Sequence, residues 1–178
     1  AGLSRPMLEH ENNINKSINL NIIGTANMVN ACSELNIKLI YFSTSYVYPG
    51  RKGNYNENDA LLPWNNYAWS KLGGECAVQM YKNSLILRVC MTERPFVHKK
   101  AFANVKLNFI FHDELVKIFI KLINKKGVIN IGGETKTVYQ FAKQYNKKVK
   151  KIFNKQNVKN SFQPNPSMNL KKLKNIIK

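Results

Sequence analysis

The sequence predicts an α/β fold in which a doubly wound parallel sheet carries helices on both faces. Three short apolar runs, at 37–42, 84–89 and 128–131, alternate with longer segments that have helical periodicity. Nearly continuous apolar strands are typical of parallel sheets that are buried on both faces. Their alternation with helices indicates βαβ units, whose functional edge lies at the carboxyl ends of the strands.

The first helix is expected from about residue 12 to residue 36. Ile14, Ile18 and Ile22 recur every four residues there, and further apolar residues continue the same face. The first strand, 37–42, follows directly.

The middle of the chain is expected to form a polar loop, a helix and a strand. The loop at 49–59 is rich in Gly and Asn, and the helix then runs from about Tyr67 to about Tyr81. The second strand, Ser84 to Val89, follows after a short turn.

The last third of the chain is expected to contain three more helices and one strand. Asp113 is predicted to cap a helix with an apolar stripe, and Gly127 opens the third strand. Thr137 and Gln140 have the spacing of a capping box. A basic loop leads to a last short helix with Leu170, Leu173 and Ile176 on one face.

Length and composition fit one domain, or part of one. The chain has 178 residues, of which 44% are hydrophobic, and it starts without a Met or a recognisable signal. No run of about 18 apolar residues suggests a membrane span. The three cysteines lack the close pairing of zinc or redox motifs and are interpreted as buried thiols in a reducing compartment. We therefore expect a cytoplasmic protein without a membrane partner.

The formal charge of +18 raises the hypothesis of a nucleic-acid ligand. Lysine outnumbers arginine 24 to 4, however, whereas bidentate phosphate recognition favours arginine. Most of the excess follows Glu134, the last acidic residue. We interpret it as solvated lysine faces and expect no nucleic-acid partner. The three histidines have no ligand spacing, so no metal site is predicted.

Tyr67 and Lys71 are the strongest candidates for chemistry. They lie four residues apart in a predicted helix, which places both side chains on one face. A strand that ends in Ser43-Thr44-Ser45 lies just upstream and delivers hydroxyl groups. Two other pairs have the same spacing: Tyr48/Lys52 straddles a Pro-Gly turn, and Tyr139/Lys143 has no such strand end nearby. Only the first pair has the context of a proton-transfer site.

The ordered motifs of the chain resemble the extended short-chain dehydrogenase/reductase family, in particular its nucleotide-sugar reductases and epimerases. Ala1-Gly2-Leu3-Ser4 resembles the loop after the fourth Rossmann strand. Asn21-Ile22-Ile23-Gly24-Thr25 resembles the Asn-x-x-Gly-Thr helix, and 42–48 resembles the Ser-Thr-x-x-Val-Tyr strand end. Within the family, dTDP-4-dehydrorhamnose reductase-like proteins are the most similar.

The resemblance implies a role for each matching residue. Thr44, Tyr67 and Lys71 would be catalytic, with Ser43 or Ser45 as alternatives to Thr44. Tyr67 would donate a proton to a carbonyl oxygen as hydride arrives, and Lys71 would favour the phenolate and hold the nicotinamide ribose. The residues expected to bind the cofactor, NAD or NADP, are Ala1, Gly2, Leu3, Asn21, Thr44, Tyr67, Lys71 and Cys90. An exposed Asn21 and a core Cys90 are the alternatives that the residues alone leave open.

The resemblance also implies that part of the fold is missing. The family begins with a glycine-rich βαβαβ half of roughly 65 to 80 residues that holds the cofactor pyrophosphate. The chain is then expected to be a Rossmann-like sheet that is incomplete at its N-terminal half. Residues 1–95 would form the catalytic C-terminal half of the NAD(P)-binding domain. Residues 96–178 would form a small substrate-binding portion interleaved with the last strand and helices.

The implied function is an NAD(P)-dependent reductase of a nucleotide-activated 4-keto-6-deoxysugar. The alternatives are a nucleotide-sugar epimerase or dehydratase, or a non-catalytic sugar-nucleotide-binding module. A dehydratase of this family usually has Asp-Glu directly after the catalytic Thr, where this chain has Ser45-Tyr46. The expected partners are the nucleotide sugar and either a second copy of the chain or the missing half.

Overall fold

The centre of the molecule is a parallel sheet of three strands, β1 (Leu39–Thr44), β2 (Ser84–Val89) and β7 (Gly127–Ile131), in the order β1-β2-β7. The computed structural model describes residues 2–4, 6–155 and 162–178. Thr44 is level with Val89, and Val89 with Ile131, so all three strands end at one edge. The α/β class and all three strands are confirmed, although β1 begins and ends two residues later than expected.

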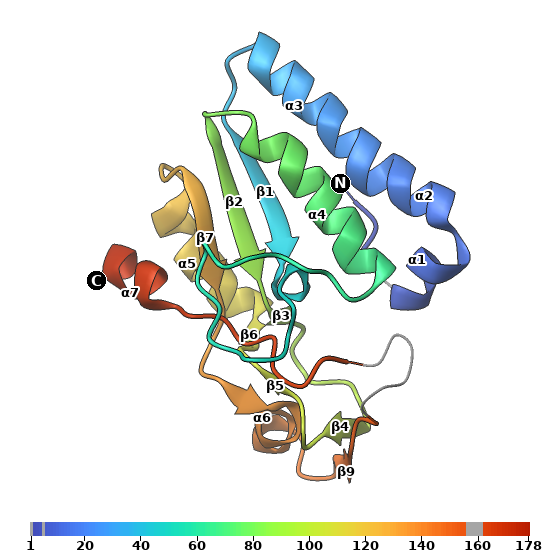
Figure 1. Ribbon diagram of the computed structural model, residues 1–178. Coiled ribbons are helices and arrows are strands. Elements are labelled where there is room, and N and C mark those ends of the chain that lie inside the picture. Colours follow the sequence, from blue (N-terminus) through green and yellow to red (C-terminus); the bar gives the residue numbers. More distant parts are fainter. Residues whose placement is uncertain (1, 5, 156–161) are drawn as a thin grey trace.

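Helices cover both faces of this sheet (Figure 1). On one face α4 (Asn66–Gln79) packs against β1 and β2, and α3 (Gly24–Glu34) packs against α4. On the other face α5 (His112–Leu122) and α7 (Lys171–Ile177) enclose a core with the apolar side chains of β2 and β7. The sheet is therefore doubly wound, as predicted.

The N-terminal helical segment differs from the single helix expected over 12–36. It consists of α1 (Met7–Asn12), α2 (Ile14–Ile18), the π-helical turn η1 (Asn19–Ile23) and α3. The break falls at Asn13, whose side chain accepts a hydrogen bond from the backbone nitrogen of Lys16 at 3.1 Å and caps α2.

The apolar face predicted for this segment is largely exposed. Ile14 is 54% exposed and Met28 54%, whereas the polar side chains of Ser17 and Asn21 are buried. Asn21 lies in the π turn. Its buried position is set by hydrogen bonds to distant segments, described below, which override the apolar periodicity of the sequence.

A smaller portion lies beyond the carboxyl ends of the sheet (Figure 1). It contains the 3₁₀ turn η2 (Ser45–Val47), the paired strands β3/β6, β4/β9 and β5/β8, and the helix α6 (Val138–Tyr145). The strand bounds are Met91–Thr92, Lys100–Phe102, Lys106–Leu107, Ile110–Phe111, Lys136–Thr137 and Lys150–Ile152 for β3, β4, β5, β6, β8 and β9. Aromatic residues of α6 and its neighbours, including Phe96, Phe111 and Phe141, form its core.

Two predicted helix caps have different outcomes. The capping box of Thr137 and Gln140 is confirmed by reciprocal hydrogen bonds of 2.9 and 3.1 Å. The prediction that Asp113 caps α5 is wrong, because the cap residue is Phe111. The backbone nitrogen of Phe111 donates to the carboxylate of Glu114 at 3.3 Å. Glu114, the residue after Asp113, is therefore the acid that caps the start of α5.

A buried ion pair fixes α4 to the sheet. The guanidinium of Arg88 on β2 binds the carboxylate of Glu75 on α4, and the two side chains are 2% and 0% exposed. Arg88 also donates to the hydroxyl of Tyr48 at 2.8 Å, which in turn donates to Asn130 on β7 at the same distance. Through these contacts, the ion pair links α4 to β2, β7 and the loop after η2.

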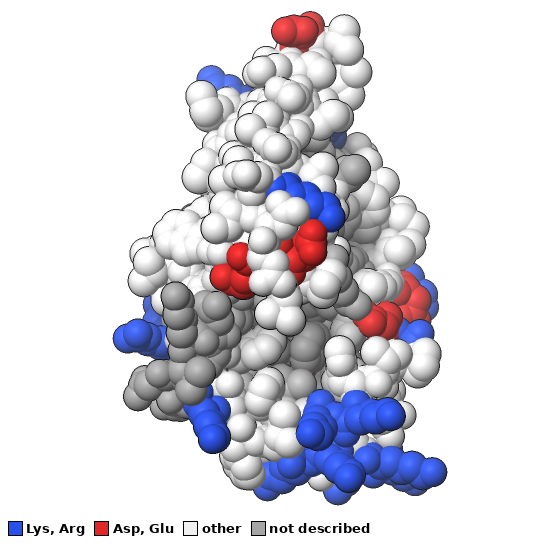
Figure 2. Space-filling model, turned by 90° about the vertical axis from the view of Figure 1, so that its right-hand side faces the viewer, with Lys and Arg blue, Asp and Glu red and all other residues white. Residues whose placement is uncertain are grey.

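Lysines gather on the smaller portion. Figure 2 shows blue side chains concentrated at the lower end of the molecule, where Figure 1 places β4, β9 and α6. The exposed lysines of these elements and their loops include Lys99, Lys100, Lys143, Lys147, Lys148, Lys150, Lys151 and Lys155. Within the described ranges, no helix is both long and apolar enough to cross a membrane. The same residues contain no cluster of three His, Cys, Asp or Glu side chains suited to a metal ion.

Candidate active site

The candidate site lies where α4 begins beside the end of β1. Asn65 caps α4, accepting from the backbone nitrogen of Ala68 at 2.7 Å, so Tyr67 lies in the first turn. α4 packs against η2, the turn directly after Thr44. The ring of Tyr46, in this turn, lies edge-on to the ring of Tyr67, with 6.4 Å between centroids. The structure thus brings the strand end and the Tyr67 helix turn together.

Lys71 lies one helical turn after Tyr67 and is half-buried. Its ammonium lies 4.1 Å from the centre of the Tyr41 ring, and Tyr41 donates its hydroxyl to the Lys71 carbonyl at 2.9 Å. Burial lowers the pKa of Lys71 to about 8, although the nearby carboxylate of Glu75 acts to raise it. A lysine that titrates near neutral pH is a common feature of functional sites.

The three hydroxyl-bearing residues at the end of β1 are all buried. Thr44 is 5% exposed, and its hydroxyl accepts from the backbone nitrogen of Tyr46 at 3.3 Å. The hydroxyl of Ser43 is buried without a partner among the residues that the structure describes. The hydroxyl of Ser45 is likewise buried without a hydrogen-bond partner in the described part of the chain. The assignment of Thr44, rather than Ser43 or Ser45, as the catalytic hydroxyl stays a prediction.

Asn21 joins the N-terminal loop to α4 and is 1% exposed. Its amide oxygen accepts from the Leu3 nitrogen at 2.7 Å, and its amide nitrogen donates to the Leu3 carbonyl at 2.9 Å and to Ser70 at 2.8 Å. A Cβ added to Gly2 would lie 3.1 Å from the same amide oxygen, so glycine permits this close approach. The exposed alternative for Asn21 is wrong. The backbone of Gly2 and Leu3 is held next to the residue that precedes Lys71, while Ala1 lies outside the described residues.

Cys90 lies in a core cluster beneath the site, with Val47 and Tyr48. Burial raises the pKa of its thiol to about 12, so the thiol stays protonated. Its backbone nitrogen donates a hydrogen bond to the Ile131 carbonyl, and its carbonyl accepts one from the Ile110 nitrogen. Cys90 is therefore a neutral core side chain, and its expected contact with the cofactor stays a prediction.

A group of aromatic side chains adjoins Tyr67 through Tyr46. Tyr46 packs at 5.0 Å from Trp64 and at 6.0 Å from Phe162, measured between ring centroids. Tyr48 is fully buried in the ion-pair network, and Trp69 is 50% exposed. Tyr46, Trp64 and Phe162 thus form one aromatic group next to Tyr67.

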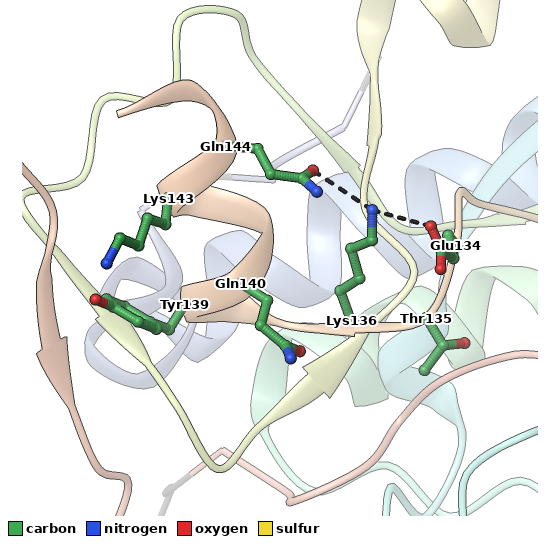
Figure 3. Close-up of a pocket in the computed structure, with 7 residues that line it drawn as sticks. All are labelled: Glu134, Thr135, Lys136, Tyr139, Gln140, Lys143 and Gln144. Atoms are coloured by element: carbon green, nitrogen blue, oxygen red, sulfur yellow. Dashed lines mark hydrogen bonds and ion pairs between the residues drawn. The ribbon is translucent and has the colours of Figure 1, made fainter. Parts of the chain in front are cut away.

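A separate hollow of about 490 Å³ lies over the start of α6. Figure 3 shows Lys136 between Glu134 and Gln144, which it contacts at 2.9 and 3.5 Å. Tyr139 and Lys143, which have the same four-residue spacing as Tyr67 and Lys71, line this hollow. The Lys143 ammonium lies 5.5 Å from the centre of the Tyr139 ring. None of the predicted catalytic residues lines it. The Tyr139/Lys143 pair therefore lies away from the hydroxyl-bearing strand end, as its sequence context indicated.

A comparison with protein-family models identifies the family of the chain. Residues 7–120 match the family described as "RmlD substrate binding domain", which is more than half of the chain. The chain belongs to the RmlD substrate binding domain family. This match spans α1, the strand end, Tyr67 and Lys71.

Solved structures share the fold of this RmlD-type chain. A hypothetical dTDP-4-dehydrorhamnose reductase from Sulfolobus tokodaii superposes with a TM-score of 0.84 at 23% identity, covering 99% of this chain and 71% of that one. The dTDP-4-dehydrorhamnose reductase from Bacillus anthracis, solved in complex with NADP, has a TM-score of 0.82 at 19% identity and coverages of 98% and 70%. They place the RmlD-type chain in the Rossmann-like fold of these reductases.

Curated relatives match shorter regions. The dTDP-D-glucose 4,6-dehydratase of Mus musculus is 31% identical over 127 residues, which are 69% of this chain and 34% of that protein. Methionine adenosyltransferase 2 subunit beta of Danio rerio is 43% identical over 67 residues, 34% of this chain and 21% of that protein. The RmlD-type chain thus spans about a third or less of these relatives.

The structure also reveals two site neighbours that the motifs did not indicate. His10 lies against the ring of Tyr67, with 5.1 Å between centroids, and Glu11 binds the first residue of α4. Their sequence, Glu9-His10-Glu11, resembles a solvated helix end. Only the docking of α1 onto α4 places them at the site.

Proposed function

We propose that the chain is the catalytic part of an NAD(P)-dependent reductase that acts on a nucleotide-activated 4-keto-6-deoxysugar. The observation that carries this proposal is the position of Tyr67 and Lys71, at the start of a helix that packs beside the hydroxyl-bearing end of β1. The sugar-nucleotide reductases with the same fold support the class of substrate.

The residues present fit the nicotinamide-ribose end of the cofactor, which would supply hydride to the substrate carbonyl carbon when bound. Lys71 offers a half-buried ammonium to ribose hydroxyls, and the Gly2-Leu3 backbone, held by Asn21, forms an adjacent wall. The pyrophosphate would be bound by a glycine-rich half that this sequence does not contain. Asn21 then acts on the cofactor through the loop that it holds.

The protein's own part in the reaction is proton transfer. Tyr67 donates its phenolic proton to the substrate oxygen, and the positive charge of Lys71 stabilises the resulting phenolate. The Thr44 hydroxyl accepts from the Tyr46 nitrogen and still has its own proton, which it donates in a second hydrogen bond to the same oxygen. Tyr46, Trp64 and Phe162 offer apolar faces to the deoxysugar.

We also propose the domain division that this function requires. Residues 1–95 form the cofactor and proton-transfer half, and residues 96–178 provide the reduced substrate-binding portion while returning β7, α5 and α7 to the sheet. We propose that a second copy of the chain, or a glycine-rich N-terminal half, completes the active unit.

A dehydratase is disfavoured although one is a curated relative. Elimination of water from a 4-keto sugar needs an additional acid and base beside the catalytic threonine. Ser45 and Tyr46 occupy these positions, neither side chain carries a carboxylate, and Ser45 is only 1% exposed. An epimerase would use the same Tyr67/Lys71 pair and remains the alternative within the enzymes.

The second candidate is a non-catalytic binding subunit. It is favoured by the 43% identity to a protein named as a subunit of methionine adenosyltransferase, whose name does not denote sugar-nucleotide chemistry. In this case, the site would bind a nicotinamide cofactor or nucleotide sugar without turnover.

The test uses the full-length protein with dTDP-4-keto-6-deoxyglucose derivatives and reduced cofactor. Consumption of reduced nicotinamide that depends on the sugar supports the reductase. Exchange of sugar stereochemistry without net cofactor consumption indicates the epimerase. Ligand binding by calorimetry without either reaction indicates the binding subunit.

A further inference from the structure

His10 is a fully buried imidazole at the end of α1, with 0% of its surface exposed. Its ring lies at 65° to the ring of Tyr67, and the centroids are 5.1 Å apart. Such an edge-to-face contact constrains both rings, since rings at this separation pack directly against each other. The proposed catalytic acid therefore has a titratable neighbour that its motif does not include.

The imidazole is anchored on one side only. Its Nδ1 lies 2.7 Å from the hydroxyl of Ser17 on α2, and Ser17 is itself 3% exposed. Its Nε2 is buried and has no hydrogen-bond partner among the residues that the structure describes. Buried polar atoms are rarely left unpaired without a functional or structural reason. The Ser17 bond thus sets the ring orientation.

α1 contacts the start of the Tyr67 helix through more than this ring. The carboxylate of Glu11 accepts from the Asn66 backbone nitrogen at 3.1 Å and from its side-chain amide at 2.9 Å. The same amide donates to the His10 carbonyl at 3.4 Å. The turn that contains Tyr67 is therefore held from α1, and His10 is the part of α1 that touches the reactive residue.

The charged groups around His10 come from all packed elements. Burial is the largest effect and lowers its pKa, Lys71 on α4 acts in the same direction, and Glu11 and Glu9 on α1 oppose it. On α2, Lys16 is paired with Glu9 at 2.9 Å. The imidazole is accordingly neutral at pH 7, and its protonation would bring a cation against Tyr67.

We propose that His10 is a positioning residue for Tyr67: its neutral imidazole, anchored by Ser17, fixes the orientation of the phenol ring. This inference rests on the proposed function for the role of Tyr67 in proton transfer. Protonation of His10 would strain the buried contact and displace the ring, so catalysis should fail on acidification before the fold does.

The first test needs no catalytic activity. The full-length protein is labelled with carbon-13 at tyrosine Cζ, and the Tyr67 signal is assigned as the one lost in Tyr67→Phe. As the pH falls below 6.5, the ordinary pKa of a histidine side chain, the Tyr67 signal should shift in one titration step. This step should vanish in His10→Phe and persist in His112→Phe, which removes an exposed histidine.

The second test is a double-mutant cycle on turnover. His10→Phe and Ser17→Ala each break the same bond, so each should lower kcat about tenfold, with little change in the KM for cofactor, and together they should lower it no further. Misplacing a reactive group by about 1 Å can cost up to about a hundredfold, which sets the upper bound.

The outcomes are distinct. A Tyr67 signal whose pH response is the same in wild type and His10→Phe overturns the proposal, as do additive losses in the cycle. If His10→Phe does not fold, Ser17→Ala alone decides, because it should move the Tyr67 signal at neutral pH. A wild-type protein that reduces no sugar but shows the coupled titration contradicts the proposed function and leaves the positioning contact established.

Discussion

Lys71 and Tyr41 contact each other twice: the ammonium of Lys71 lies 4.1 Å from the Tyr41 ring centre, and the Tyr41 hydroxyl donates to the Lys71 carbonyl at 2.9 Å. The sheet therefore holds both the backbone and the charge of the proposed catalytic lysine. Its partner is the residue three positions before Thr44 on β1. Strand and helix are joined at the point where proton transfer is proposed.

Tyr67→Phe should remove turnover while preserving the fold. The substitution keeps the ring and its packing on His10 but deletes the transferable proton, so kcat should fall by about 10² to 10⁴. Cofactor binding, measured by calorimetry, should be unchanged. Tyr139→Phe is the matched control, since it shares the spacing to a lysine on α6. Full kcat in Tyr67→Phe, or an equal loss in Tyr139→Phe, would refute the assignment.

Lys71→Met should stabilise the cofactor-free protein at pH 7 and weaken its affinity for cofactor. The pKa of Lys71 falls from 10.5 to about 8 on folding, so the unfolded chain binds more protons between these values and wild-type stability rises with pH across this window. Removing the buried cation should raise the free energy of unfolding at pH 7 by up to about 3 kcal/mol.

The gain in Lys71→Met should disappear above pH 10.5, where the lysine is neutral in both states. Urea denaturation at several pH values measures it. Lys143→Met, which replaces the exposed lysine of the Tyr139/Lys143 pair, should show no comparable gain in stability. A loss of stability in Lys71→Met at pH 7 would show that its contacts outweigh the cost of burial.

Glu75→Gln should destabilise the fold strongly. It leaves Arg88, which is 2% exposed, with a buried charge and no anionic partner, and breaking such pairs costs about 3 to 5 kcal/mol. Glu9→Gln breaks the exposed pair with Lys16 and should cost less than about 1 kcal/mol. Equal midpoints of the two variants in chemical denaturation would contradict the proposed importance of the network.

Asn21→Ala should loosen the N-terminal loop. It removes three hydrogen bonds and leaves the Leu3 nitrogen and carbonyl without their amide partner, at a cost of about 1 to 3 kcal/mol. Faster hydrogen exchange at Leu3 and weaker cofactor binding are expected. Asn54→Ala, in the loop after η2, is the control and should leave cofactor affinity unchanged. Unaltered exchange at Leu3 would show that other contacts hold the loop.

The open edge of β1 should make the 178-residue chain associate. Among the described strands, only β2 pairs with β1, so its other edge offers unpaired backbone groups to a further strand. Light scattering of the chain alone should detect dimers or larger species. Co-expression with a glycine-rich N-terminal half should reduce them, and a stable monomer would contradict this view.

The sequence was sufficient for the parts of the fold that depend on local pattern. Apolar runs located β2 and β7, and the spacing of Thr137 and Gln140 located a helix start. The Tyr67/Lys71 pair was selected from three matches because a strand end preceded it, and the structure brings that strand end to the helix.

The parts that failed depend on contacts between distant segments. Apolar periodicity could not show that Asn21 would be buried, because its partners Leu3 and Ser70 are 18 and 49 residues away. No sequence spacing relates His10 to Tyr67, so their contact follows only from the packing of α1 on α4. The π turn also depends on packing, since a Cβ at Gly74 would lie 2.5 Å from the Asn21 carbonyl.

The π turn at Asn19–Ile23 constrains how the length of this segment can vary. A π turn holds one more residue than an α turn, so deleting a single residue there would restore an uninterrupted α-helix. Everything before the deletion would then rotate by about 100° about the helix axis. His10 and Ser17 both precede the turn, so they would rotate together away from Tyr67 while Cys32 stayed buried. A one-residue deletion would thus remove the His10 contact from the site without disturbing the rest of α3. Chains that keep this site are expected to keep the extra residue.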